Sequence, residues 1–320
     1  MTTPNQHWSN YWQQGHITSF GQSFSGNYTG VLKEVWQDII VNLPDNFAVL
    51  DLATGNGAIP QLIADHFAED KKYGQVIGVD LATVNDYRPK NSEYLAVELI
   101  GGVDCAKLSF PDDHFDIVTS QFGIEYSDLN KSLVEAIRVL KPGGKLVIIG
   151  HHEDSLIINR NRDILQVISH PKAAQVIDCL AGLANAMIQV RTQQDLEVIK
   201  TSKECESLRI SLNEALSILA QISQQGLEDS ELLTYVSQYF KQGLGWPLDK
   251  RQSFINHCSE QQLALKTRLG ELIAAAQSQE TLLATLQPCL TNKVTLASLD
   301  SLVSDDKQIL AWRLQVNKSS

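Results

Sequence analysis

The stretch VLDLATGNGAIP, residues 49–60, joins a short apolar run to a loop with two glycines and then to the start of an amphipathic segment. Loops of this kind connect a buried parallel strand to a helix, and their glycines let a nucleotide approach the backbone closely. The apolar run contains Asp51, and the glycines are Gly55 and Gly57. The stretch therefore predicts a nucleotide-binding turn in an α/β sheet.

Short apolar runs and amphipathic segments alternate on both sides of this loop. We expect helices at residues 58–67 and 128–140, and KPGG, residues 141–144, should end the second helix. The apolar runs predict strands at residues 47–53, 75–80, 94–100, 115–122 and 145–150. Apolar strands that alternate with helices predict a parallel sheet with helices on both faces, which binds its ligands at the carboxyl ends of the strands.

Composition narrows the class of protein. The chain has 320 residues and a net charge of -11, which weighs against a nucleic-acid partner. Its five cysteines form no C-x-x-C pair, so we expect reduced thiols and no metal site. The start, MTTPNQHWSN, has no signal-peptide pattern, and no apolar run has the length of a membrane span. These features favour a soluble cytoplasmic protein.

Three kinds of nucleotide loop compete for the glycine stretch. A P-loop needs a lysine after its glycines, and none follows Gly57. A dinucleotide loop needs a small residue at the third position of G-x-G-x-x-G/A, where this chain has Pro60. The acid ahead of the glycines, Asp51, suits a cationic ligand group such as the ammonium of an amino acid. The loop therefore matches neither of the two phosphate-binding patterns.

The loop resembles the first motif of the class I S-adenosylmethionine-dependent methyltransferases, [DE]-x-G/A-x-G-x-G. DLATGNG matches it, with Ala53 in the first small position. VIGVD, DCAKLSFPDDHFDIV and VLKPGGKLVI are similar to three further motifs, in the family's order, over residues 47–150. The resemblance implies a Rossmann-like, doubly wound, mostly parallel seven-stranded sheet, S-adenosyl-L-methionine as cofactor, and methyltransferase activity.

The resemblance also implies roles for the loop residues. Asp51 would bind the cofactor's ammonium, Asp80 the ribose hydroxyls, and Asp104 with the Cys105 amide the adenine edge. Residues 81–93 are few, so the family's second helix is abbreviated or absent. The expected cofactor-binding residues are Asp51, Ala53, Thr54, Gly55, Asn56, Gly57, Asp80, Leu81, Asp104, Cys105, Gln121 and Phe122.

Catalysis needs few groups, because methyl transfer is an in-line displacement in which the protein mainly positions the reactants. A general base is required only when the nucleophile carries a proton. His151 and His152 follow the fifth predicted strand and Glu125 follows the fourth, so these three are the catalytic candidates. The expected substrate contacts are Tyr126 and members of an aromatic N-terminal arm, namely Tyr11, Trp12, His16, Phe20 and Tyr28.

The chain's end predicts how the sheet is completed. Five parallel strands alone would leave an apolar edge exposed, and family members add two strands, the last antiparallel to its neighbours. Residues 293–303 and 309–318 read as that hairpin. The expected organisation is an aromatic cap and helix at 1–46, a cofactor-binding core at 47–155, a large all-helical insertion between the fifth and sixth strands at 156–286, and a C-terminal β-hairpin at 287–320.

Three functions remain open at this point. The first is transfer of a methyl group to an O or N nucleophile of a small molecule. The second is methylation of a protein or a tRNA, with the helical insertion as the docking surface. The third is a non-catalytic partner protein that binds S-adenosylmethionine. We expect no DNA partner and no membrane association, and the insertion is a candidate lid or homodimer contact.

Overall fold

The computed structural model describes residues 6–19, 26–69, 71–84, 93–187, 195, 199 and 201–320. The chain forms two compact units. Met1–Leu156 and Ala275–Ser320 form the sheet unit, and Ile157–Ala274 form the helical unit. Within the described residues, no helix has the length and apolar character needed to cross a membrane.

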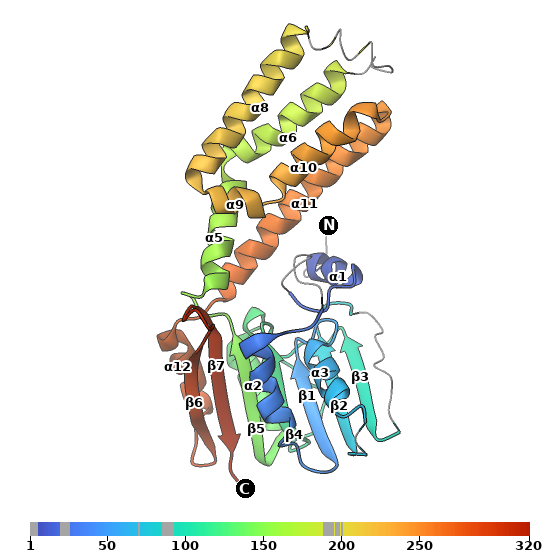
Figure 1. Ribbon diagram of the computed structural model, residues 1–320. Coiled ribbons are helices and arrows are strands. Elements are labelled where there is room, and N and C mark those ends of the chain that lie inside the picture. Colours follow the sequence, from blue (N-terminus) through green and yellow to red (C-terminus); the bar gives the residue numbers. More distant parts are fainter. Residues whose placement is uncertain are drawn as a thin grey trace. The chain divides into compact units, whose positions relative to one another are not determined.

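The part of the sheet unit that the structure describes contains a seven-stranded sheet in the order β3-β2-β1-β4-β5-β7-β6 (Figure 1). Strands β1 to β5 are parallel, and β7 is antiparallel to both β5 and β6. The strands are β1 (Phe47–Leu52), β2 (Gly74–Asp80), β3 (Leu95–Gly101), β4 (Phe115–Gln121), β5 (Leu140–Gly150), β6 (Val294–Val303) and β7 (Ile309–Lys318). This mixed sheet confirms the predicted α/β class, and β6 with β7 is the hairpin that the sequence predicts.

The strand order fixes where a ligand site can form. The order reverses between β1 and β4, and in such sheets ligands bind beyond the carboxyl ends of the strands at that point. Asp51 lies near the end of β1, Asp80 ends β2, Gln121 ends β4 and Gly150 ends β5. Because β1 to β5 are parallel, these four residues share one edge of the sheet.

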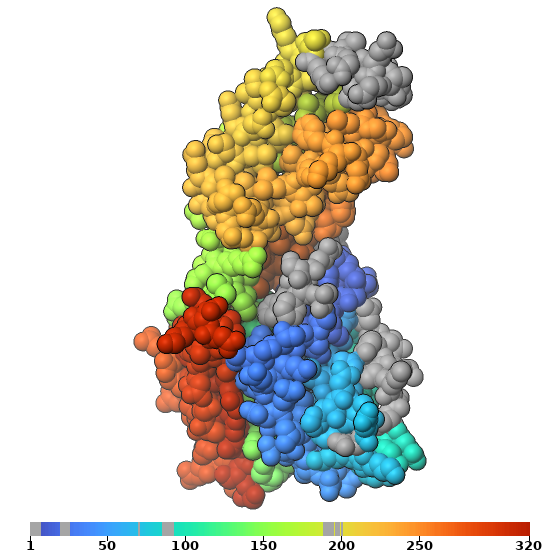
Figure 2. All heavy atoms as spheres, in the orientation of Figure 1, coloured from blue at the N-terminus to red at the C-terminus, as the bar shows by residue number. Residues whose placement is uncertain are grey.

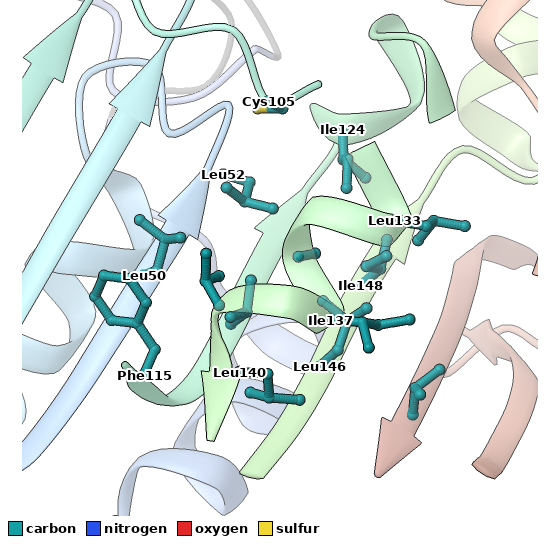
Figure 3. Packing of buried hydrophobic residues seen from close by; sticks show 14 of the residues in the cluster. Leu50, Leu52, Cys105, Phe115, Ile124, Leu133, Ile137, Leu140, Leu146 and Ile148 are labelled. Atoms are coloured by element: carbon teal, nitrogen blue, oxygen red, sulfur yellow. The ribbon is translucent and has the colours of Figure 1, made fainter. Parts of the chain in front are cut away.

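Helices cover both faces of the sheet. Figure 1 and Figure 2 show α2 (Gly30–Ile40) and α3 (Ala58–His66) on the face turned toward the viewer. In Figure 3, Leu133 and Ile137 of α4 (Leu129–Val139) lie among strand side chains of the main core cluster. That cluster also contains Leu286, at the end of α12 (Gln279–Leu286). The sheet is thus buried by apolar helix faces, as strands apolar on both sides require.

The helix α4 ends at Val139, before residues 141–144, as predicted, whereas the prediction that the fifth strand begins at residue 145 is wrong. β5 begins at Leu140 and runs through these residues. Phe115 pairs with Leu140 but Ile117 pairs with Lys145, so the extra residues form an irregularity in β5. Gly143 takes the left-handed conformation there, with φ of 83°, which glycine adopts without strain.

The helical unit has its own core. Its described elements are α5 (Leu156–Ser169), which begins at the last residue of the sheet unit, α6 (Pro171–Ala186), α8 (Lys203–Ile222), α9 (Gln224–Asp229), α10 (Leu232–Lys241), η2 (Gly243–Gly245) and α11 (Leu248–Ala275), which ends at the first residue of the returning segment. Val176, Leu180 and Leu219 are fully buried among them. Arg251 is 1% exposed, and its guanidinium donates to the carbonyls of Met187, Gly243 and Leu244. This side chain therefore joins the end of α6 to η2 and α11.

Helices α5 to α11 come between β5 and β6 in the chain. The chain leaves the sheet unit after Leu156 and returns at Ala275. Within the sheet unit the two crossing points are adjacent, because the Gln277 N–H donates to the His151 carbonyl at 2.9 Å and His152 forms a bridge with Gln277. The sequence analysis ends the insertion at residue 286, whereas the helical unit ends at Ala274. The helix α12 lies in the segment between these two boundaries, and its Leu286 is buried in the core of the sheet unit.

Two further elements bear on the site. The helix α1 (Gln6–Gln13) lies near the N-terminus, and Figure 1 shows it beyond one end of β1, β2 and β3. The short helix η1 (Ile124–Tyr126) follows β4 directly. Both lie in the sheet unit, so their contacts with the strand ends can be described.

Candidate active site

The glycine loop after β1 has the backbone that its residues predict. Ala53, Gly55 and Gly57 have φ of 52°, 54° and 83°, and Gly57 is the N-cap of α3. A Cβ on Gly55 would lie 2.6 Å from Cζ2 of Trp12, and one on Gly57 would lie 2.9 Å from Cδ1 of Leu99. Neighbours and conformation thus both require glycine at these positions.

Asp51 is the buried acid of this loop, with 2% of its surface exposed. Its Oδ2 accepts the Thr54 hydroxyl at 2.6 Å, and its Oδ1 accepts the Thr119 hydroxyl at 2.8 Å. Burial raises the pKa of Asp51 to about 7, the two hydroxyls oppose that rise, and the charge of Asp80 adds to it. A ligand cation beside this carboxyl would favour its ionised form, so the position suits an ammonium group.

Asp80 is held by backbone amides. Its Oδ2 accepts the Gly55 N–H at 2.7 Å and its Oδ1 accepts the Ala82 N–H at 2.8 Å. Burial raises the pKa of Asp80, and the two amides act in the opposite direction. The carboxylate is therefore fixed in orientation at the end of β2, where its remaining lone pairs can accept hydroxyl groups.

The loop after β3 brings the expected adenine-binding residues beside Asp80. The Val103 N–H donates to the Asp80 carbonyl at 2.9 Å. Cys105 is buried, and burial together with the charge of Asp80 raises the pKa of its thiol to about 12. Asp104 is exposed and its Oδ1 accepts the Ala106 N–H. Leu81 is 51% exposed, which leaves an apolar side chain at the mouth of this region.

A cavity lies between the ends of β1 and β4, the start of α3 and the N-terminal segment, with an empty volume of about 330 Å³ that includes its open mouth. We call it the loop cavity. Its lining residues are Trp12, Ile17, Ser19, Tyr28, Asp51, Ala53, Thr54, Ala58, Ile59, Gln121 and Phe122.

The arm, residues 8–19, lies directly on the glycine loop. The amide of Asn56 donates to the carbonyls of Trp12 and His16 at 2.8 and 2.7 Å. The Thr83 N–H donates to the Ser9 hydroxyl at 3.1 Å, and Tyr11 stacks on His16. The structure therefore places Tyr11, Trp12 and His16 beside the loop rather than at the ends of β4 and β5.

Three other residues predicted from the sequence remain to be placed. The side-chain amide of Asn56 is used by the arm, as just described. Tyr28 lines the loop cavity, and burial raises its hydroxyl pKa well above the ordinary range. Phe20 lies outside the described residues. The aromatic arm is thus assembled around the loop.

A second group of side chains gathers where β4 and β5 end. Phe122 has φ of 52° and stacks on the His151 ring, with centroids 4.6 Å apart. The backbone N–H of His151 donates to Oε1 of Glu125 at 2.9 Å, and the Tyr126 hydroxyl lies 3.3 Å from the ring Nε2 of His151. Trp8 of the arm meets Tyr126 edge to face. The structure thus brings Glu125, Tyr126 and His151 together, as expected of residues that follow neighbouring parallel strands.

Burial sets the protonation states here. It lowers the pKa of His151 to about 3, so this imidazole is neutral, and it raises the pKa of Glu125 to about 7. His152 is separate from this group: its ring stacks on Trp312 with centroids 4.0 Å apart, and its Nδ1 accepts the Asp154 N–H.

A second, largely apolar cavity adjoins this group and has an empty volume of about 390 Å³, its open part included. We call it the β5 cavity. Within the part of the chain that the structure describes, Oε2 of Glu125 and Nδ1 of His151 have no hydrogen-bond partner. The cavity is lined by Ile124, Glu125, Leu129, Leu133, Ile148, Gly150, His151, Gln277, Leu282, Trp312 and Leu314.

Sequence reasoning missed several of these residues. Thr119, which binds Asp51, is a polar residue in an apolar strand, and that contrast was a usable signal. No such signal marks Trp36, whose indole N–H donates to the side-chain Oε1 of Gln121, or Gln277 and Trp312 of the β5 cavity, because these residues come from distant parts of the chain.

Comparison with known proteins places this geometry among methyltransferases. The family model described as "ubiE/COQ5 methyltransferase family" matches residues 11–188. The "Ubiquinone/menaquinone biosynthesis C-methyltransferase UbiE" of Rickettsia akari is 34% identical over 128 residues, which are 37% of this chain and 50% of that protein. The "Demethylmenaquinone methyltransferase" of Bacteroides fragilis is 35% identical over 102 residues, 32% of this chain and 42% of that protein.

The chain spans about half the length of the curated relatives it matches. Among solved structures, a putative S-adenosylmethionine-dependent methyltransferase from Listeria monocytogenes aligns with 91% of this chain and 100% of its own. Its TM-score is 0.41, and 13% of the aligned residues are identical.

Proposed function

Because the chain belongs to the ubiE/COQ5 methyltransferase family, we propose that it transfers a methyl group from S-adenosyl-L-methionine to a small-molecule acceptor. This family membership confirms the resemblance to class I methyltransferases found in the sequence. The observation that carries the proposal is the pair of buried acids, Asp51 and Asp80, on either side of a left-handed glycine loop. A cationic amino-acid group and a ribose are the ligand parts that such a pair fits.

The cofactor residues divide the molecule's parts among them. Asp51 holds the ammonium, the Gly57 end of α3 faces the carboxylate, and Asp80 accepts the ribose hydroxyls. Cys105, beside Asp80, provides an amide for the base. When bound, S-adenosylmethionine supplies an electrophilic methyl group on a sulfonium. The arm residues Tyr11, Trp12 and His16, together with Tyr28, enclose the cofactor rather than the acceptor.

The acceptor belongs at the ends of β4 and β5. Phe122, Glu125, Tyr126 and His151 surround that position with rings and a carboxyl group. The sequence favours an O or N nucleophile, whereas one relative is named a C-methyltransferase of quinone biosynthesis. We therefore propose a carbon nucleophile of an electron-rich ring as the acceptor. His152, which stacks on Trp312, has a structural role in this scheme.

The helical unit is best explained as an insertion between β5 and β6. Its chain leaves and re-enters the sheet unit beside His151 and His152, at the edge where ligands bind. A unit joined there is suited to select acceptors or to act as a lid. Contact between two copies of the chain is the other role that we assign to it.

Two measurements test the proposal. Calorimetric titration with S-adenosylhomocysteine should show binding that Asp51→Asn weakens, and titration with NAD should show none in the same range. Incubation with methyl-labelled S-adenosylmethionine and reduced demethylmenaquinone should place the label on the quinol. Binding without transfer to this acceptor or to a panel of phenols would favour the non-catalytic alternative, and tight NAD binding would overturn the family-based assignment.

A further inference from the structure

We propose that the carboxylate of Glu125 takes up the proton that the acceptor loses during methyl transfer. This assignment rests on the proposed function and names the proton acceptor of that same site. It assigns the role to Glu125 and not to the two other catalytic candidates, His151 and His152.

The first argument is the geometry of the carboxyl group. Glu125 lies on η1, directly after β4, and is 8% exposed. The His151 N–H holds its Oε1 at 2.9 Å. Its Oε2 is buried and has no hydrogen-bond partner among the described residues. A buried, unsatisfied oxygen costs stability, so its presence calls for a role other than holding the fold together.

The second argument is that Glu125 has a suitable place beside the β5 cavity. Glu125 and His151 line the β5 cavity, and Phe122, stacked on His151, lines the loop cavity. The charge of Glu125 also contributes to the raised pKa of Tyr28, another residue of the loop cavity. Glu125 is therefore linked to the loop cavity through His151 and the stacked Phe122 ring, and we place the reacting acceptor against this group.

The third argument is that the neighbouring groups are unsuited to the task. Burial lowers the pKa of the His151 imidazole to about 3, so this ring does not retain a proton near neutral pH, and its Nε2 faces the Tyr126 hydroxyl. His152 is engaged with Trp312 and the Asp154 N–H. The groups that act on the Glu125 carboxyl are backbone amides of residues 123, 125 and 151, and burial is the dominant influence. A base with a pKa near neutrality fits proton transfer at physiological pH.

The proton balance is simple. The acceptor's electron pair forms the new bond to the methyl carbon, and the bonding pair of the sulfonium–methyl bond returns to sulfur. The C–H bond at the methylated ring carbon then breaks, its electron pair restores the aromatic ring, and its proton protonates Glu125, which gives a neutral carboxylic acid. The proton then passes to solvent when the products leave, and the carboxylate is restored for the next turnover.

The test compares Glu125→Gln with wild type, and uses Glu34→Gln on the exposed face of α2 as the matched control. With reduced demethylmenaquinone as acceptor, the wild-type rate should rise with pH through an apparent pKa of about 7. Glu125→Gln should lose roughly 10²- to 10⁴-fold of the rate and its pH dependence. Glu125→Asp should recover part of both. S-adenosylhomocysteine affinity should be unchanged in all three variants, which also shows that they fold.

A second readout needs no acceptor. In protein labelled with ¹³C at glutamate carboxyl carbons, the resonance absent from Glu125→Gln should titrate near pH 7. A resonance that titrates at the ordinary value for glutamate, about 4.3, overturns the proposal, as does a Glu125→Gln rate within threefold of wild type. A wild-type chain that binds no S-adenosylhomocysteine contradicts the proposed function instead. If the chain binds it but leaves demethylmenaquinol unmethylated, the acceptor is wrong, and the rates of the Glu125 variants are compared with a phenol of the panel that the wild type methylates.

Discussion

Cofactor binding should release a proton from Asp51. Burial raises the pKa of this carboxyl from 3.8 to about 7 in the chain without ligand. At pH 6 the group is therefore roughly nine-tenths protonated, and at pH 8 it is about one-tenth protonated. An ammonium group beside it favours the carboxylate, so binding of S-adenosylhomocysteine should release about 0.9 proton at pH 6 and about 0.1 at pH 8.

Calorimetry in buffers of different ionisation enthalpy measures this release directly. Asp51→Asn keeps one acceptor oxygen for the Thr54 or the Thr119 hydroxyl and presents an amide donor to the other. This variant should bind more weakly and release no proton at either pH. Asp38→Asn, an exposed position on α2, is the matched control and should behave as wild type. Equal release by wild type and Asp51→Asn at pH 6 would refute the assignment of the ammonium to Asp51.

The raised pKa of Asp51 also makes the free energy of unfolding depend on pH. Because the folded chain raises the pKa of Asp51, it favours the protonated form, and the free energy of unfolding falls as pH rises between about 4 and 7. A pKa difference of about 3, at about 1.4 kcal/mol each, gives a cost of about 4 kcal/mol above pH 7. Asp51→Asn should remove most of this pH dependence in urea unfolding and be the more stable protein at pH 8. A variant that is less stable than wild type at pH 8 would contradict the calculation.

Three further outcomes follow from other parts of the chain. Asp80→Ala removes charge-assisted hydrogen bonds worth about 1.5–3 kcal/mol, so S-adenosylhomocysteine affinity should fall roughly 10- to 100-fold; an unchanged affinity in calorimetry would remove the ribose from Asp80. Replacing residues 157–274 with a Gly/Ser linker should leave a core that binds S-adenosylhomocysteine but turns over no acceptor, and loss of binding would show that the helical unit is part of the cofactor site. Arg251→Met leaves three buried carbonyls without their donor and should destabilise the helical unit by about 3–5 kcal/mol in denaturant unfolding, while a loss below about 1 kcal/mol would show that the guanidinium is dispensable.

The cofactor side of the site could be read from the sequence because its parts are local. An apolar run that ends in an acid and a glycine loop fixes a strand, a turn and a helix within residues 47–66. Asp80 follows the same rule at the end of β2. These residues meet because parallel strands place their carboxyl ends at one edge, which follows from the pattern alone.

The acceptor side could not be read in the same way. The β5 cavity joins Glu125 and His151 to Gln277 and Trp312, which follow β5 by more than a hundred residues, and no sequence pattern states that contact. Burial lowers the pKa of His151 to about 3. This shift depends on the residues packed around the ring, so the residue type alone predicted a stronger base than the structure gives. The aromatic residues of the arm are compatible with either the cofactor or the acceptor side of the site. Hydrogen bonds from the Asn56 side chain hold the arm on the glycine loop.

We propose above that the chain moves a methyl group from S-adenosylmethionine to a small molecule. The most direct measurement is mass spectrometry of both products after incubation with reduced demethylmenaquinone and S-adenosylmethionine that carries a deuterated methyl group. We expect the deuterated methyl group on the quinol and one S-adenosylhomocysteine for each methylated molecule. The amounts of both products should be strongly reduced in Asp51→Asn. Unlabelled quinol together with intact S-adenosylmethionine, in a protein shown to bind S-adenosylhomocysteine, would contradict it.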